Sequence, residues 1–162
     1  MNRQIAIINR SSAVGLWGSV GVVVATALFV LGPYRFAPQS PYVERWMLVT
    51  GTVLAVLAIG MVLMVVRRRI PALRQTENLD TKLEGYAQHV RSLYLTMLAV
   101  VAVVCGLALL SSQSVLLMLA MLATLVLFLN YPGMYRVKVD LGLSDDDMHA
   151  LYGDQYPTAD GQ

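Results

Sequence analysis

The sequence predicts an all-α, polytopic membrane protein: a single domain over residues 1–162, built as a four-span helix bundle with a cytoplasmic helical hairpin. Of the 162 residues, 57% are hydrophobic and 14% are charged, whereas charged residues make up about a quarter of a soluble domain. The apolar residues also gather in four runs without a charge, each near the length that crosses ~30 Å of hydrocarbon as a helix. The runs are 13–31, 47–66, 93–110 and 115–131.

The first run follows a short basic start that contains Arg3 and Arg10 and no acid. A cleaved secretory signal peptide also has a basic start, an apolar segment and a cleavage site, and Ala25-Thr26-Ala27 resembles such a site. The apolar run continues to Leu31, well past that point, and this favours an uncleaved spanning helix.

The second run has an interfacial aromatic residue before it and cations after it. Residues 32–45 contain three prolines and three aromatic residues, which predict a stiff external loop without continuous helix. Trp46 then opens the run, and three arginines at 67–69 follow it. This arrangement is typical of a helix that leaves the membrane on its cytoplasmic side.

The polar stretch 67–92 predicts a helical hairpin outside the membrane, and the tail 132–162 is expected on the same side. Pro71 should bend or end the helix that leaves the membrane, with Ile70 and Leu73 facing the next helix. Asn78 fits the N-cap of that next helix, which we expect to run unbroken over 79–110 and to project roughly 18 Å beyond the hydrocarbon. Apolar residues recur along it at spacings of 4, 3, 4 and 3, the pattern of a buried seam. The seam is Leu79, Leu83, Tyr86, Val90 and Leu93.

Two capping patterns predict the last helices. Ser114 follows an uncharged turn and is expected to be the N-cap of the fourth span. Ser144 precedes three aspartates, which suit the first turn of a short peripheral helix over 145–152. Leu143 and Met148 have the spacing of a hydrophobic staple across its start.

The basic residues predict the orientation. With four spans, ten of the twelve Lys and Arg residues fall on one side, and Arg35 and Arg45 fall on the other. Basic residues concentrate on the cytoplasmic side of membrane proteins, so both termini are predicted to be cytoplasmic. A bacterial plasma (inner) membrane is the simplest location.

No residue pattern predicts an enzyme, a metal site or a cofactor. The four apolar runs lack the ionisable residues that mark proton relays and ion paths. Asp145, Asp147 and His149 alternate along a helix, which points them to different faces rather than to one ion. Cys105 is the single cysteine, and the serines have no base nearby in the sequence. We therefore expect no catalytic activity, and no nucleic acid as a partner.

Three groups of residues are candidates for interactions. The cytoplasmic seam (Leu79, Leu83, Tyr86, Val90) is predicted to bind a protein partner. Four arginines, Arg67, Arg68, Arg69 and Arg74, would contact anionic membrane lipid, although topology alone also explains them. Small residues are expected at helix contacts, either within the bundle or between chains: Gly15, Ser19, Gly51, Ala55, Ala102 and Gly106.

The stretches YVERWMLVTGTVLAVL, YAQHVRSLYLTMLAVV and YPGMYRVKVDLGLSDDDM resemble segments of small, uncharacterised four-helix inner-membrane proteins of Gram-negative bacteria. The resemblance brings no functional residues. The leading hypothesis is a scaffold or accessory subunit with a cytoplasmic protein-interaction surface, acting with a protein partner or as a homo-oligomer. The alternative is a passive channel or a transport protein for lipid or a small apolar ligand. A continuous cavity lined by Thr26, Thr52, Thr96 or Thr124 would favour that alternative.

Overall fold

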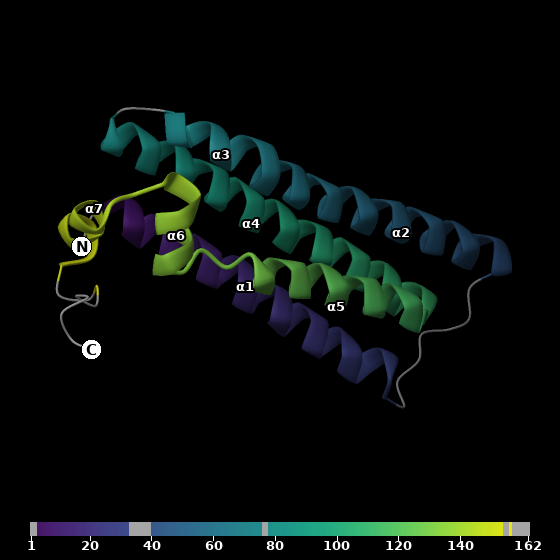
Figure 1. The fold of residues 1–162 in the computed structure, drawn as a ribbon. Helices are drawn as coiled ribbons and strands as arrows, with labels where there is room; N and C mark the ends of the chain where they lie inside the picture. Colours follow the sequence, from purple (N-terminus) through teal and green to yellow (C-terminus); the bar gives the residue numbers. More distant parts are fainter. Residues whose placement is uncertain (1–2, 33–39, 76–77, 154–155, 157–162) are drawn as a thin grey trace.

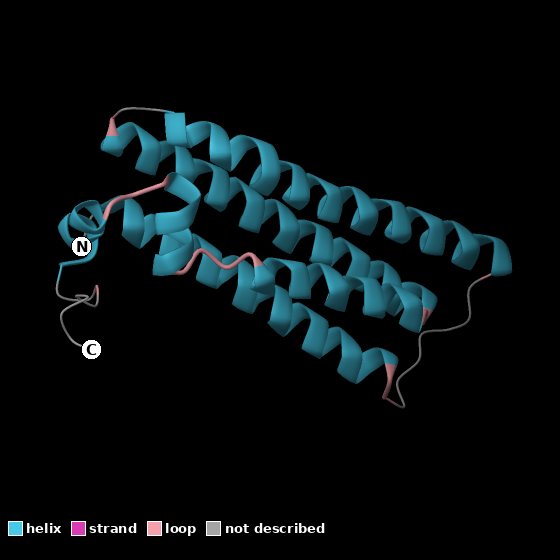
Figure 2. Ribbon diagram, in the orientation of Figure 1, coloured by secondary structure: helices cyan, strands magenta, loops and turns pink. Residues whose placement is uncertain are grey.

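Four long helices lie side by side in the computed structural model, which describes residues 3–32, 40–75, 78–153 and 156. Within these ranges every regular element is helical, so the all-α prediction is confirmed (Figure 2). Three short helices gather at the end of the bundle where the chain starts (Figure 1). The long helices are α1 (Arg3–Val30), α2 (Pro41–Met64), α4 (Leu79–Ser111) and α5 (Ser114–Leu129), and the short ones are α3 (Ile70–Ala72), α6 (Met134–Leu141) and α7 (Asp145–Tyr152).

Helix α4 is the centre of the bundle, and the other long helices pack around it. It runs parallel to α1, because Gly15 lies against Tyr94 and Gly18 against Leu98. Helices α2 and α5 run in the opposite direction, and the Tyr94 hydroxyl donates to the Leu127 carbonyl of α5 at 3.1 Å. The predicted single helix is confirmed, and its 4-3 seam continues through the whole length of α4. The seam beyond Leu93 consists of Met97, Val101, Val104, Ala108 and Ser111.

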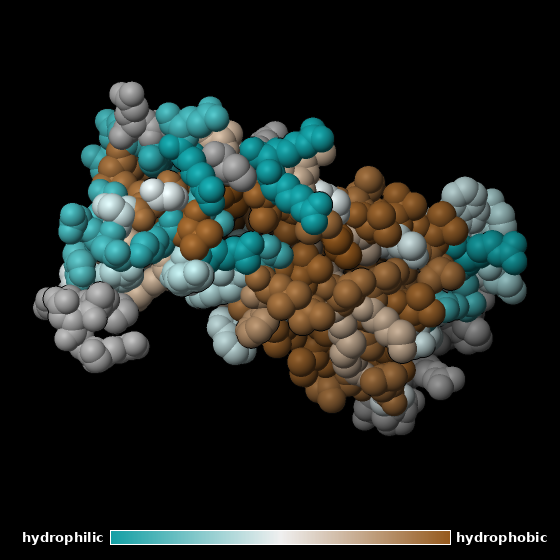
Figure 3. Space-filling model, viewed as in Figure 1, coloured by the Kyte–Doolittle hydropathy of each residue, from teal (hydrophilic) through white to brown (hydrophobic). Residues whose placement is uncertain are grey.

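Three helices, α1, α2 and α4, are long and apolar enough to cross a membrane. Helix α5 has only 16 residues and is shorter than these three helices, whereas α5 and α6 together are long and apolar enough, with a 75° bend between them. Figure 3 shows the apolar surface as a band over the long helices, with polar residues at both ends.

Helices α1 and α2 both begin before the first residue of the spans predicted from the sequence. Helix α1 begins at Arg3, so residues 3–12, which precede the predicted span, are helical as well. Helix α2 begins at Pro41, inside the predicted loop, with Ser40 as N-cap. Proline fits this first turn because its missing N–H would have no helical partner there. The rest of the predicted loop, 33–39, lies outside the described residues.

The helix that continues α2 changes its hydrogen-bond pattern before Pro71. Residues Val65–Arg69 form a π-helical turn, in which the Ile70 N–H bonds to the Val65 carbonyl. Proline donates no hydrogen bond and its ring crowds the preceding turn, and a widened turn is one way a helix accommodates it. The chain continues through a 3-10 turn to Gln75, where Leu73 packs on Gly85 of α4. Ile70 is buried, as the hairpin prediction expected.

The sequence prediction is right for two of the three proposed N-caps. The Asn78 side chain accepts from Asp80 N at 2.9 Å, and Ser144 forms a reciprocal capping box with Asp147 at the start of α7. The proposal for Ser114 is wrong, because Ser114 is already helical and Gln113 takes the N-cap position. The preceding Ser112 adopts a left-handed conformation (φ 51°), which turns the chain between α4 and α5.

Helix α6 was not predicted. It lies between Gly133 and Gly142, and its two buried residues, Val137 and Leu141, are four positions apart. Gly142 ends it in a left-handed conformation (φ 64°). The sequence contains these two glycines and the two apolar residues four positions apart, but the pattern covers only eight residues. One hydrophobic core joins this helix to α1, α4 and α7. Its members at this end include Ile5, Ile8, Leu83, Tyr86, Val90, Val137, Leu141, Met148 and Leu151.

Candidate partner and lipid-contact surfaces

The seam predicted to bind a partner is buried by the chain itself. Leu83 is fully buried, Tyr86 and Val90 are 1% and 4% exposed, and Leu79 is partly buried in the same core. The spacing therefore identified a packed face correctly, but its assignment as a partner-binding surface is wrong. The sequence prediction failed here because it left the start of α1 and all of α6 out of the helical structure. Both contribute side chains to the core that contains the seam.

A polar network joins α4, α5 and α6 beside this core. The Tyr86 hydroxyl donates to Asp140 Oδ2 at 3.0 Å, and Arg136 Nε lies 3.7 Å from the same carboxylate oxygen. Arg136 also donates to the Leu129 carbonyl at 2.7 Å and to Asn130 Oδ1 at 2.8 Å. These acceptors lie at the C-terminal end of α5, where helical carbonyls lack a partner. Arg136 thus holds the bend between α5 and α6.

The arginines predicted to contact lipid have different environments. Arg74 is exposed and donates to the carbonyls of Val139 and Asp140, so it closes the C-terminal turn of α6, and its contact with lipid remains a prediction. Arg67 and Arg68 are exposed, and lipid contact remains a prediction for them. The side chain of Arg69 lies outside the described part of the structure.

The acidic start of α7 forms contacts within the chain. Hydrogen bonds from Lys138 Nζ and then from the Tyr156 hydroxyl lower the pKa of the Asp145 carboxyl. The Ser144 hydroxyl and backbone N–H lower the pKa of Asp147 in the same way. His149 lies edge-on to the Tyr156 ring, with 5.0 Å between ring centroids. In the described ranges no three His, Cys, Asp or Glu side chains come together as a possible metal site.

Four of the six predicted packing residues lie at contacts between helices. A β-carbon at Gly15 would be 2.7 Å from Tyr94 Cβ, and one at Gly51 would be 2.6 Å from Leu116 Cδ2. Ser19 is fully buried, with its hydroxyl donating to the Gly15 carbonyl at 2.7 Å. Ala55 is 1% exposed. Small side chains at these positions let the helix backbones approach closely.

The other two packing residues face away from the bundle. Ala102 is exposed, and a β-carbon at Gly106 would meet no described atom within 4 Å. The expectation that they pack between helices of this chain is therefore wrong. The 4-3 seam of α4 turns the opposite side of the helix outward, and Ala102, Gly106 and the exposed Ala99 lie on that side. We call these three residues the outer face of α4.

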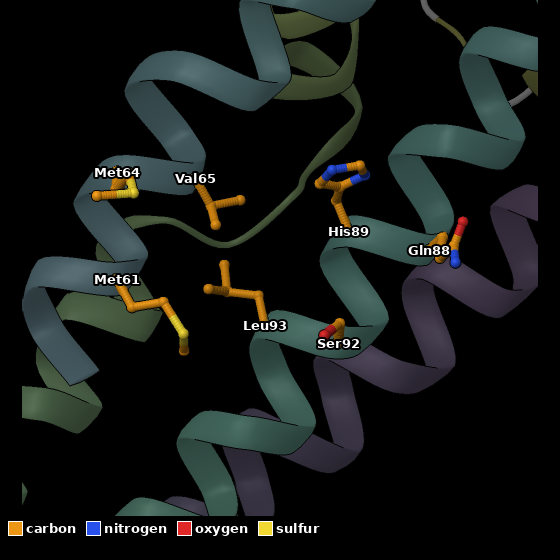
Figure 4. Close-up of a pocket in the computed structure, with 7 residues that line it drawn as sticks. All are labelled: Met61, Met64, Val65, Gln88, His89, Ser92 and Leu93. Atoms are coloured by element: carbon orange, nitrogen blue, oxygen red, sulfur yellow. The ribbon is translucent and has the colours of Figure 1, made fainter. Parts of the chain in front are cut away.

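An open pocket of about 300 Å³ lies between α2 and α4 (Figure 4). Its apolar wall consists of Met61, Met64, Val65 and Leu93, and its polar wall consists of Gln88, His89 and Ser92. The His89 Nδ1 atom lies 2.6 Å from the Gly85 carbonyl of its own helix. That contact orients the ring, and the described lining brings no second titratable group to it.

The threonines named for the channel alternative have different environments. Thr26 is buried in α1, and Thr124 is buried in α5 with its hydroxyl donating to the Ala120 carbonyl at 2.9 Å. Thr96 is exposed on the outside of α4. Thr96 therefore faces away from the interior in which Thr26 and Thr124 are buried, so these three hydroxyls do not line one internal path.

Comparisons of the chain with protein-family models, with curated proteins and with solved structures found no match. The function is therefore inferred from the sequence and the geometry alone.

Proposed function

We propose that this chain is an integral membrane scaffold or accessory subunit with no catalytic activity of its own. In this proposal four spans hold it in a bacterial plasma membrane, and both termini are cytoplasmic. The observation that supports the membrane location in this proposal is the apolar band between two polar ends (Figure 3). Large apolar side chains on three helices are exposed there, among them Trp17 (70%), Leu57 (65%) and Phe128 (63%). In water, a protein with such a surface would aggregate, whereas in a membrane the lipid would cover the surface.

Helix α5 is the fourth span in this proposal, although it is short. Its 16 residues extend about 24 Å at 1.5 Å per residue, and they run back along α4 as far as the level of Tyr94. Arg136 then donates to the Leu129 carbonyl, and the chain turns by 75° into α6. We propose that α6 lies along the membrane surface, with the 80% exposed Tyr135 in the headgroup zone.

The proposed orientation rests on the charges. Arg10 lies in the first part of α1, Arg67 and Arg68 directly follow α2, and Arg91 lies in the first half of α4. These parts of the helices lie toward the end of the bundle that also carries α6 and α7 (Figure 1), and we call this end the basic end. Basic residues face the cytoplasm in most membrane proteins, which supports a cytoplasmic basic end.

Thiol labelling tests the topology. We expect cysteines introduced at Ser40 and Ser112 to react with a membrane-impermeant reagent in sealed cells, and a cysteine at Gln75 to react only after the cells are opened. The native Cys105 is buried, so it should give little background. The orientation would be refuted if the cysteine introduced at Gln75 reacted in sealed cells as strongly as those introduced at Ser40 and Ser112.

The surface that we propose for a partner is the outer face of α4. Small side chains leave the backbone of α4 accessible there, and no described helix of the chain covers Ala102 or Gly106. In lipid, such faces allow a second helix to approach closely. A spanning helix of another membrane protein, or a second copy of this chain, is the kind of partner that fits.

Gly106→Leu tests this partner surface. Its new side chain meets open space within the chain, so the melting temperature of the purified monomer in detergent should stay within about 2 °C of the parent, as expected for a surface change. Partners cross-linked in native membranes should be lost, because leucine would prevent close approach. Gly60→Leu is the matched control, since Gly60 is equally open but lies on α2. Unchanged cross-linking in Gly106→Leu would refute the partner surface.

A further inference from the structure

We propose that a groove between α1 and α4 at the basic end binds one phospholipid with an anionic headgroup. The groove is a hollow of about 330 Å³. Two arginines from different helices line it together, and no carboxylate is part of its described lining. The lining residues are Ile7, Arg10, Ser11, Val14, Arg91 and Leu95.

The two arginines lie where a lipid phosphate would be. Arg10 is the last charged residue before an uncharged stretch that extends to residue 34, and Arg91 is the last before one that extends to residue 135. Helices α1 and α4 run parallel, with Gly15 against Tyr94, so the two arginines lie at nearly the same level. In the proposed membrane orientation, that level is the boundary between headgroups and hydrocarbon.

The guanidinium groups are available for an anion. Among the described residues the ion pairs involve Arg136 and Lys138, and neither Arg10 nor Arg91 takes part in one. Guanidinium groups donate paired hydrogen bonds to phosphate oxygens, and two of them can hold one phosphodiester from both sides. Glu84 lines the adjacent hollow, two helical turns before Arg91 and therefore farther from the apolar band.

The opposite end of the groove is apolar and suits an acyl chain. Val14 and Leu95 lie on the membrane side of the arginines and are 52% and 44% exposed. A free phosphate ion would use only the arginines, whereas a phospholipid would use both parts of the groove. The combination of the two parts points to the lipid.

This inference rests on the proposed membrane location, and the experiment separates the two. The protein is purified in a mild detergent and mixed with dioleoylphosphatidylglycerol or dioleoylphosphatidylcholine, and bound lipid is counted by native mass spectrometry. We expect the anionic lipid to be retained preferentially. The double variant Arg10→Gln with Arg91→Gln should retain about tenfold less of it, because each basic residue near the surface adds to the attraction.

Three further variants identify the site. The matched control, Arg45→Gln, removes an exposed arginine at the start of α2, at the opposite end of the bundle, and should retain the anionic lipid within about twofold, because Arg45 is not in the groove. Val14→Trp fills the apolar part and should reduce lipid retention with both arginines intact. Arg10→Lys with Arg91→Lys keeps the charges and should retain an intermediate amount, since lysine lacks the paired donors. All variants should melt like the parent in detergent without added lipid, because the altered side chains are exposed.

Several outcomes would refute the lipid site. These are equal retention of the two lipids, equal losses in the groove and control variants, or no effect of Val14→Trp. Competition by millimolar inorganic phosphate in the parent and in Val14→Trp alike would show a free-anion site instead. Extraction of the chain from native membranes by alkaline carbonate would refute the proposed membrane location itself, independently of any lipid measurement.

Discussion

Introducing aspartate at both Leu83 and Val90 is expected to open the basic end of the bundle while the long helices remain inserted. Both side chains are at most 4% exposed, in the core that joins α1, α4, α6 and α7. A carboxylate at such a site has no partner there and loses its hydration, so each change should cost more than about 3 kcal/mol. Membrane insertion depends on the apolar runs, which the substitutions leave intact.

Limited proteolysis measures this effect. We expect much faster cleavage between Arg67 and Arg91, with unchanged recovery in the membrane fraction. Gln88→Asp is the matched control, because Gln88 lies on the same helix but is exposed, and it should be cleaved like the parent. If the double variant resists protease as well as the control does, the basic end is not a packed core.

Gly15→Leu is expected to separate α1 from α4. A β-carbon at Gly15 would lie 2.7 Å from Tyr94 Cβ and 3.0 Å from the Tyr94 carbonyl oxygen, closer than real β-carbons approach such atoms. Tyr94 cannot move aside easily, since it is 1% exposed and its hydroxyl bonds to Leu127 of α5. The helices must therefore shift, at a cost of about 1–3 kcal/mol or more.

Thermal melting in detergent measures this cost, with the fluorescence of the two tryptophans, Trp17 and Trp46, as the signal. Gly60→Leu is again the control, because leucine there meets no described atom within 4 Å. We expect a lower melting temperature for Gly15→Leu and an unchanged one for Gly60→Leu. Equal melting of both variants would show that the contact between Gly15 and Tyr94 is absent in the protein.

Periodic patterns allowed the sequence to predict the long elements. The 4-3 spacing from Leu79 to Leu93 identified the buried side of α4, and the capping pattern at Ser144 placed α7 correctly. Such patterns report which side of a helix is buried, but not what covers it. The seam was therefore assigned to a partner, although the chain folds back and covers it with its own residues.

Short or local features were harder to predict. Helix α6 has eight residues, too few for a clear period, and Pro41 counted against a helix although the first turn accepts proline. A small residue can lie at a contact between helices or on the outer side of a helix, and the sequence does not distinguish these two cases. Gly15 lies at a tight contact and Gly106 faces outward, and only the position around the helix distinguishes them. The groove with Arg10 and Arg91 joins residues of two helices and has no local signature.

The parallel packing of α1 against α4 has a consequence for biosynthesis. Gly15 and its neighbour Tyr94 are 79 positions apart, so a ribosome that adds about 5–20 residues per second needs roughly 4–16 s to make the second after the first. In the proposed membrane location, α1 would lie in lipid without its main neighbour during that interval. The hydroxyls of Ser12 and Ser19 need no partner on α4 during this interval, because they donate to carbonyls of α1 itself, at Ile8 (2.6 Å) and Gly15 (2.7 Å). The nascent helix thus exposes no unsatisfied hydroxyl at these positions before α4 arrives.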